Sequence, residues 1–254
     1  MQIDLTGRRA LVTGGGSGIG AAIARELGAR GADVAVHYAS SAEGAEQLVG
    51  ELTAAGRASV ALQGDLTVTA DADRVVAGAV EALGGLDIVV NNAGHLVGRA
   101  TVAEMSDEHW HRVIDVNLTS AFAVSRAAAP HLAASEHGRV VVMSSLAAEN
   151  GGGQGSVAYA TAKAGAVGFT RALAKEFAPD GVTVNAVAPG FIEDTAFHNT
   201  FTPPEAQKNM IAGIPLQRAG TVEDVANVTA FLASDLSSFV TGQVIDINGG
   251  TNFR

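Results

Sequence analysis

The stretch "RALVTGGGSGIGAAIARELGARGADVAVHY", residues 9–38, decides the fold of this chain. It opens with a short apolar run, passes through a glycine-rich turn into an Ala-rich stretch of helical composition, and ends in a second apolar run. A strand, a turn, a helix and another strand in this order form the unit from which parallel sheets are built. Glycines at such a turn let backbone N–H groups approach a phosphate at the N-terminus of the following helix.

The same alternation continues to the end of the chain. Short apolar runs occur at 9–14, 33–38, 58–64, 86–94, 138–145, 181–190 and 242–250. Helical stretches are predicted near 18–30, 41–55, 68–83, 107–134, 157–178 and 222–233. Continuous apolar runs without strict alternation indicate strands buried on both faces, as in parallel sheets. The sequence therefore predicts an α/β fold with a doubly wound, Rossmann-like parallel sheet of seven strands and helices on both faces.

No Pro- or Ser-rich linker divides the chain, so we expect a single domain over residues 1–254. The one irregular insertion is 191–216, which carries Pro203, Pro204 and Pro215. A long segment at the carboxyl end of a parallel strand is where a substrate lid is expected. A surface loop without function is the alternative.

Composition excludes several classes of protein. The chain has no cysteine, which rules out disulfides, thiol catalysis and cysteine-bound metal. A formal net charge of −10 disfavours nucleic acid and anionic membrane as partners. The N-terminus lacks the apolar core of a signal peptide, and no run is long enough to span a membrane, so a cytoplasmic protein is expected. The histidines show no metal-ligand spacing, and no metal is expected.

Several short motifs follow the glycine turn in a fixed order. The turn itself has the spacing G-x-x-x-G-x-G, and after it come "NNAG" (91–94), Asn117, the pair Ser144 and Ser145, "YATAK" (159–163) and "PGFI" (189–192). Together these motifs resemble the short-chain dehydrogenase/reductase family over essentially the whole chain. The chain is similar to bacterial members of the 3-oxoacyl-(acyl-carrier-protein) reductase type.

The resemblance implies a nicotinamide cofactor. Residues expected to contact it are Gly14, Ser17, Gly18, Ile19, Gly20, Tyr38, Ser40, Ser41, Asp65, Leu66, Asn91, Ala93, Gly94, Tyr159, Lys163, Pro189, Gly190 and Ile192. An acidic residue at the end of the second strand would bind the ribose 2′-hydroxyl and repel a 2′-phosphate. That position is Tyr38, and hydroxyls follow it, so NADP(H) is favoured over NAD(H). The basic residue that many NADP-using relatives carry in the turn is Ser17 here.

Tyr159 and Lys163 lie one helical turn apart, so their side chains project from the same face. Alone, this is typical of a solvated surface pair. Beside a cofactor turn, Tyr159 is the candidate general acid and base, with a pKa lowered by the lysine cation and by an oxidised nicotinamide. Ser145 is expected to hold the substrate oxygen. The resemblance assigns Lys163 to the nicotinamide ribose and Asn117 to a proton relay, although a solvated helix residue is the alternative for Asn117.

One departure from the family concerns the spacing before the tyrosine. Relatives place the serine one residue closer to the tyrosine than Ser145, so the segment between them carries an extra residue. Ser144 lies farther still, and Ser145 remains the choice. The pocket wall at 149–154 is where this difference falls. Downstream, Asp194 stands where relatives often have threonine, with Thr195 next.

The substrate is inferred from charge. By alignment, Glu136 and Asp180 occupy the positions where the carrier-protein reductases use arginines to bind their acidic partner. Acidic residues there disfavour docking, so a free small alcohol or ketone is expected. The alternatives are a 3-oxoacyl-(acyl-carrier-protein) reductase and a non-catalytic NAD(P)-sensing protein. Enoyl reductases and sugar epimerases of this fold differ in Tyr–Lys spacing or in the glycine turn. By resemblance, the helices 107–134 and 157–178 would form a homotetramer.

Overall fold

A computed structural model describes residues 3–193, 195, 200–201 and 203–253 of the chain. Seven parallel strands form one sheet in the order β3-β2-β1-β4-β5-β6-β7, which confirms the predicted doubly wound sheet. The strands are β1 (Arg9–Val12), β2 (Asp33–Tyr38), β3 (Ser59–Gln63), β4 (Ile88–Asn91), β5 (Arg139–Met143), β6 (Thr183–Pro189) and β7 (Val244–Ile247). Val34 pairs with Ser59 across β2 and β3, and Val140 pairs with Val184 across β5 and β6.

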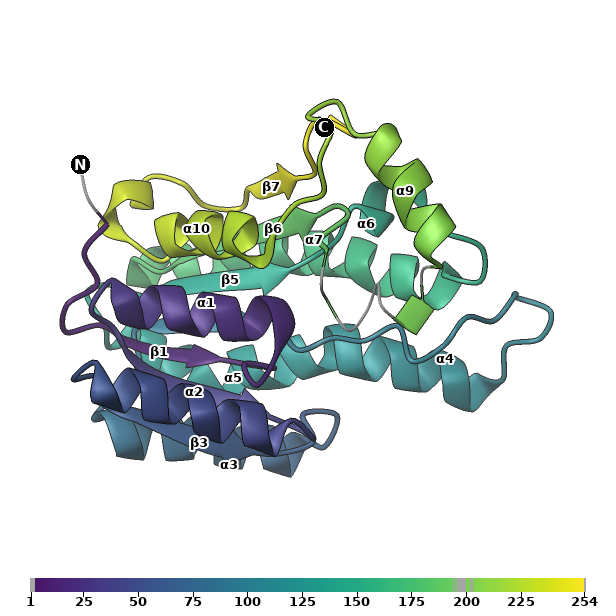
Figure 1. Ribbon diagram of the computed structural model, residues 1–254. Helices are drawn as coiled ribbons and strands as arrows, with labels where there is room; N and C mark the ends of the chain where they lie inside the picture. The colour runs from purple at the N-terminus through teal and green to yellow at the C-terminus, as the bar shows by residue number, and fades with distance from the viewer. Residues whose placement is uncertain (1–2, 194, 196–199, 202, 254) are drawn as a thin grey trace.

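Helices cover both faces of the sheet (Figure 1). One apolar cluster packs α1 (Gly18–Ala29), α2 (Ala42–Ala54) and α10 (Val222–Leu232) on one face. A second cluster packs α3 (Thr69–Leu83), α5 (Ser120–Ala133) and α7 (Val157–Phe177) on the other. The strands β1, β4, β5 and β6 are almost entirely buried, which explains why their apolar runs show no alternation, while the edge strands β3 and β7 are partly exposed.

The strand order reverses between β1 and β4. The segments that leave these two strands turn in opposite directions, and ligands of open α/β sheets bind in the crevice formed there, outside the carboxyl ends of the strands. The glycine turn follows β1 and the "NNAG" motif follows β4, so both lie at this point. The topology therefore places the two motifs at one edge of the sheet.

The predicted helix at 107–134 is interrupted. It divides into α4 (Asp107–Ile114), a π-helical turn (Asp115–Thr119) and α5. Asn117 lies in the π-helical turn, where its side chain reaches back to donate to the Val113 carbonyl oxygen at 2.9 Å. π-Helical turns inside longer helices are frequent at functional sites. The described residues also form the short helix α6 (Ala147–Asn150), the helix α9 (Pro204–Ala212) and 3₁₀ turns at Ala178–Asp180 and Asp235–Ser237. None of the described helices is long and apolar enough to cross a membrane.

Candidate active site

The glycine turn between β1 and α1 has no room for side chains at Gly15, Gly16 and Gly20. Gly14 and Gly18 have left-handed φ angles of +63° and +52°, which glycine alone adopts without strain. A Cβ on Gly20 would lie 2.1 Å from the Gly14 carbonyl oxygen, and one on Gly16 would lie 2.7 Å from the Ser41 carbonyl oxygen. Only glycines permit this close backbone packing, so the turn leaves space for a ligand at the start of α1.

The first helix begins without a side-chain cap. Ser17 is the N-cap residue of α1 and makes no capping hydrogen bond, and the first turn contains no acidic residue. The uncapped N–H groups and the positive end of the helix dipole favour an anion here. Gly18, Ile19 and Gly20 form this first turn. The N–H of Gly14, in contrast, is donated to His37 Nδ1 at 3.1 Å, so Gly14 shapes the turn and does not offer that donor to a ligand.

The end of β2 carries hydroxyls and no carboxylate. Tyr38 is the last residue of the strand and is partly buried, and the exposed residues Ser40 and Ser41 follow it. Ser41 is the N-cap residue of α2 and makes no capping hydrogen bond with its side chain. The hydroxyls at this edge can therefore donate to an anionic group.

Asp65 follows β3 and is held by its neighbours. Its Oδ1 accepts from the Thr67 backbone N–H at 3.0 Å and from the Thr67 hydroxyl at 2.7 Å, while Oδ2 lies 3.3 Å from Arg112 Nη1. The hydrogen bonds from Thr67 lower the pKa of Asp65 below its usual value. The N-cap of α3 is Val68, so neither Asp65 nor Thr67 caps the helix itself. Leu66 is buried beside them.

Residues 91–94 and Asn117 meet behind the carboxyl end of β4. Asn91 is buried with its Nδ2 donating to Ser125 Oγ at 3.0 Å. The Asn117 side-chain amide forms two hydrogen bonds with the backbone of His95. Its Nδ2 donates to His95 O at 2.7 Å, and its Oδ1 accepts from His95 N at 3.1 Å. The Asn117 Nδ2 thus donates twice and its Oδ1 accepts once, and a solvated helix residue is ruled out because Asn117 is buried.

Gly94 lets two of the predicted catalytic residues approach each other. A Cβ at this position would lie 2.7 Å from Asn117 Oδ1 and 3.0 Å from Lys163 Nζ. Any larger residue would enter the space shared by these two polar groups. Ala93, the preceding residue, donates its N–H to Thr13 Oγ1 at 3.0 Å, which fixes the loop against the start of the glycine turn.

The two adjacent serines have different surroundings. Ser144 is buried, and its hydroxyl donates to the Lys163 carbonyl oxygen at 2.9 Å, which ties β5 to α7. Ser145 is partly exposed; its Oγ accepts from Ala147 N at 3.1 Å and also bonds the Tyr159 hydroxyl. Only Ser145 is therefore placed to share a substrate oxygen with Tyr159.

Tyr159 and Lys163 share one face of α7, and the surface-pair alternative is excluded because Lys163 is buried. Its Nζ lies 5.7 Å from the Tyr159 ring centroid and donates to the Met143 carbonyl oxygen at 2.9 Å. Burial lowers the pKa of Lys163 from 10.5 to about 8. Burial also raises the pKa of Tyr159, and the Ser145 hydrogen bond opposes this. The expected lowering of the Tyr159 pKa is therefore not produced by these side chains alone.

The segment after β6 is anchored at both ends. Pro189 ends β6 and accepts from Leu146 N at 2.9 Å, Gly190 donates to Ile247 O at 2.9 Å, and Ile192 forms a bridge with Gly220. Phe191, Ile214 and Ala219 form a small apolar cluster that joins the two ends. Between them, α9 has no buried residue. Asp194 lies outside the described residues, and Thr195 is buried and donates to Ile192 O at 3.2 Å.

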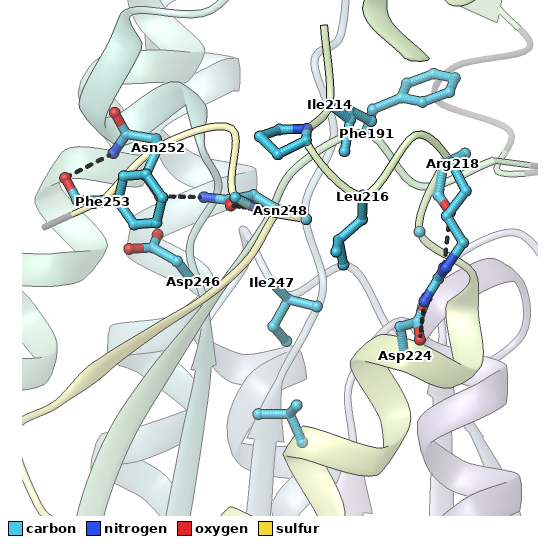
Figure 2. Close-up of a pocket in the computed structure, with 16 residues that line it drawn as sticks. Phe191, Ile214, Leu216, Arg218, Asp224, Asp246, Ile247, Asn248, Asn252 and Phe253 are labelled. Carbon is cyan, nitrogen blue, oxygen red and sulfur yellow. Dashed lines mark hydrogen bonds and ion pairs between the residues drawn. The ribbon is translucent and has the colours of Figure 1, made fainter. Parts of the chain in front are cut away.

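A cavity of about 780 Å³ opens beside the second anchor, between 214–220 and the C-terminus (Figure 2). Figure 2 shows Leu216 and Ile247 on its wall and the Arg218–Asp224 ion pair at one side. Ser145, Tyr159 and Lys163 do not line it. On the opposite side of the segment, the Phe201 ring meets the His95 ring edge-on with centroids 5.6 Å apart. This contact joins the segment to the loop after β4.

Arg99 is a site feature that sequence reasoning missed. Its Nη1 donates to Gln154 O at 2.9 Å and to Ser156 Oγ at 2.8 Å, and Ala100 N donates to Gly155 O at 3.2 Å. The segment that carries the extra residue between serine and tyrosine is thus fixed to the loop after β4. A single arginine in a loop belongs to no helix or strand pattern that the sequence would show. Only the unusual number of residues between Ser145 and Tyr159 drew attention to this region.

The residues at the carboxyl edge fit a dinucleotide. A Cβ on Gly16 or Gly20 would fill the glycine turn, the α1 N-terminus is free of acidic side chains, and the Asn91 Oδ1 atom is buried without a hydrogen-bond partner. Within the described residues, no group of three or more His, Asp or Glu side chains could hold a metal ion.

Comparisons with known proteins agree with this geometry. The family described as Enoyl-(Acyl carrier protein) reductase matches residues 14–252. The chain is similar to the 3-oxoacyl-(acyl-carrier-protein) reductase FabG of Staphylococcus aureus, with 41% identity over 246 residues that cover 96% of this chain and 97% of that protein. A short-chain dehydrogenase from Burkholderia cenocepacia, solved in complex with NADP, is 37% identical, with a TM-score of 0.91 over 98% of this chain and 99% of that one. A metagenomic blue fluorescent protein in complex with NADPH is 36% identical, with a TM-score of 0.92, over 98% and 100% of the two chains.

The chain belongs to the short-chain dehydrogenase/reductase family. It is an NAD(P)-dependent oxidoreductase that interconverts a hydroxyl and a carbonyl group. The ordered motifs therefore identified both the family and the class of reaction correctly.

Proposed function

We propose that this enzyme reduces a free small ketone to an alcohol, and catalyses the reverse oxidation, with NADP(H) as the preferred cofactor. The observation that carries the proposal is the convergence of Ser145, Tyr159 and Lys163 beside the glycine turn. Tyr159 and Ser145 are hydrogen-bonded to each other, and the buried Lys163 lies against the Tyr159 ring.

The roles follow from the chemistry of each side chain. When bound, the reduced nicotinamide supplies the hydride for the carbonyl carbon. The Ser145 hydroxyl holds the carbonyl oxygen as a hydrogen-bond donor. Tyr159, whose raised pKa keeps the phenol protonated, transfers its proton to that oxygen as the hydroxyl forms. Lys163 supplies positive charge beside the resulting phenolate, and Asn117 fixes the His95 loop that closes this side of the site.

Cofactor choice rests on the end of β2. A 2′-phosphate beside Tyr38 would meet the hydroxyls of Ser40 and Ser41 and no carboxylate. The N-terminus of α1 would face the pyrophosphate, and Pro189, Gly190 and Ile192 would face the nicotinamide. The solved relatives named above hold NADP and NADPH, which supports the same preference. Titration with NADPH and NADH side by side tests it, and equal or tighter binding of NADH would refute it.

Substrate size rests on surface charge. Glu136 and Asp180 are exposed at the amino ends of β5 and β6, in a chain of net charge −10. Carboxylates repel an acidic carrier protein. The relatives at 41% identity are named as carrier-protein reductases, so carrier-bound 3-oxoacyl groups are the alternative substrate.

The experiment compares purified enzyme on free ketones and on carrier-bound acetoacetyl groups. The wild type should favour free ketones, and the double variant Glu136→Arg/Asp180→Arg should gain rate on the carrier-bound substrate. A control, Asp73→Arg/Glu81→Arg on the exposed side of α3, changes the net charge equally and should not gain it. A wild type that prefers the carrier-bound substrate would contradict the proposal.

Two further parts of the proposal concern assembly and closure. The segment 191–216 acts as the substrate lid, because its ends are anchored, α9 is not buried, and Phe201 reaches His95.

A homotetramer forms through α4, α5 and α7, where Phe122 is an exposed apolar residue on α5. Light scattering tests the second part, and a mass of one subunit would refute it. Tyr159→Phe should bind cofactor normally but lose turnover, which separates an enzyme from a cofactor sensor.

A further inference from the structure

His37 is a buried histidine with a partner on each ring nitrogen. It lies on β2 with 2% of its surface exposed. The Gly14 N–H donates to Nδ1 at 3.1 Å, so Nδ1 carries no proton. Nε2 lies 3.1 Å from the Gly64 carbonyl oxygen, which only accepts, so Nε2 carries the proton. The two contacts together require the neutral tautomer protonated at Nε2.

The contact with Gly14 acts on the first residue of the glycine turn. Gly14 has a left-handed φ of +63°, and its carbonyl oxygen accepts from Asn92 Nδ2 at 3.1 Å. Gly15 N donates to the His37 backbone oxygen at 2.8 Å. The entry to the turn is therefore held by His37 through both its ring and its backbone.

The contact with Gly64 connects the turn to the end of β3. Gly64 precedes Asp65, and Gly64 N donates to the Tyr38 carbonyl oxygen at 3.1 Å. One imidazole thus spans β1, β2 and β3 at their carboxyl ends. A donor at Nδ1 would face the Gly14 N–H and force the two groups apart, because neither can accept.

We propose that neutral His37 is a positioning residue that sets the glycine turn for the cofactor's pyrophosphate, and that its protonation loosens the turn and weakens cofactor binding. The inference rests on the proposed placement of the pyrophosphate at this turn. It concerns the part of the cofactor that NADPH and NADH share, so both should be affected alike.

Charged groups around His37 act in both directions. Burial lowers its pKa most, Arg74 lowers it further, and Asp65 and Asp71 raise it, as does the hydrogen bond to Gly64. Cofactor binding should therefore be full at neutral pH and fall in acid, by up to about tenfold for each pH unit below the pKa of His37 in the free enzyme.

Three substitutions separate the two contacts. In His37→Asn, Oδ1 takes the place of Nδ1 and still accepts from Gly14. In His37→Gln, the terminal amide takes the place of Nε2 and leaves the Gly14 N–H buried without an acceptor. His37→Phe keeps a ring and loses both bonds. We expect His37→Asn to bind NADPH nearly as the wild type does, and the other two to bind it about tenfold or more weakly.

The assay is a fluorescence titration with NADPH and NADH between pH 5 and pH 8. The 2′-phosphate of NADPH itself titrates near pH ~6, so the comparison that matters is wild type against His37→Asn. The acid-induced loss of affinity for NADPH should be larger in the wild type than in His37→Asn, because only the wild type has an imidazole that becomes protonated at this position. Nitrogen-15 NMR of the wild type should show the Nε2-protonated tautomer at neutral pH, which keeps the inference testable if a variant fails to fold.

Three results would overturn the inference: the Nδ1-protonated tautomer, wild-type affinity in His37→Gln, or equal pH profiles in wild type and His37→Asn. A wild type that binds neither nucleotide would instead overturn the proposed cofactor site. The two failures are therefore distinguishable.

Discussion

Replacing Lys163 with methionine should make the folded protein more stable while removing its activity. The ammonium group is buried with 3% of the residue exposed, and burial lowers its pKa from 10.5 to about 8. A displacement of this size corresponds to about 3 kcal/mol of unfavourable free energy for the charged form at neutral pH. Losing the charge-assisted hydrogen bond to Met143 O costs about 2 kcal/mol, so a net gain of about 1 kcal/mol is expected in the free energy of unfolding.

The pKa of Lys163 also predicts how the stability of the wild type changes with pH. Between pH 8 and pH 10.5 the unfolded lysine holds its proton while the folded one has lost it, so the unfolded state binds more protons. Stability of the wild type should therefore rise with pH over this window, by up to about 1.4 kcal/mol per pH unit from this group. Below pH 8 both states are protonated and the whole penalty is present. Lys163→Met lacks this contribution, and its advantage should disappear by pH 10.5.

Urea denaturation at fixed protein concentration measures both effects. Lys175→Met, an exposed lysine on the same helix, is the control and should change stability by less than about 0.5 kcal/mol. In thermal melts the gain corresponds to roughly 2–4 °C. A destabilised Lys163→Met variant, or a difference from the wild type that stays constant from pH 7 to pH 10.5, would refute the reasoning.

Further predictions concern the glycine turn and the serine pair. Gly20→Ala places a Cβ 2.1 Å from the Gly14 carbonyl oxygen, so it should weaken NADPH binding by tenfold or more, roughly the effect of 1–3 kcal/mol of overpacking, as measured by fluorescence titration. Ser145→Ala should lower kcat by about 100-fold with little change in melting temperature. Ser144→Ala should instead lower the free energy of unfolding by about 1 kcal/mol, because it loses the bond to the Lys163 carbonyl; equal kinetic effects of the two serine variants would contradict their assignment.

Much of the fold could be predicted because parallel strands carry a strong local signal. Val140, Val141 and Val142 are buried on both faces of the sheet, and their apolar run is visible in the sequence. The π-helical turn at Asp115–Thr119 gives no such signal. It depends on the Asn117 side chain replacing a helical donor and reaching the His95 backbone, which is a contact between segments distant along the chain.

The site shows the same limit. Residue types and spacing predicted Ser145 over Ser144, and the structure places only Ser145 beside Tyr159. Burial is what the sequence does not show. The lysine was expected to lower the tyrosine pKa, but removal from water raises the pKa of Tyr159 and lowers that of Lys163.

These opposite shifts decide which group of the pair loses its proton first. Burial disfavours charge, so it raises the pKa of the Tyr159 phenol and lowers that of the Lys163 ammonium to about 8. As pH rises, the lysine therefore deprotonates before the tyrosine, and a titration near pH 8 in this protein belongs to Lys163. Nitrogen-15 NMR of the lysine Nζ should show this titration in the cofactor-free wild type and also in Tyr159→Phe. Its disappearance in Tyr159→Phe would mean that the phenol is the group that titrates, and that Lys163 keeps its charge as the sequence had suggested. If the lysine titration persists in Tyr159→Phe, the phenol of Tyr159 stays protonated near pH 8 and is suited to donate a proton, as reduction requires. Oxidation would then require a positive charge beyond the one that Lys163 provides.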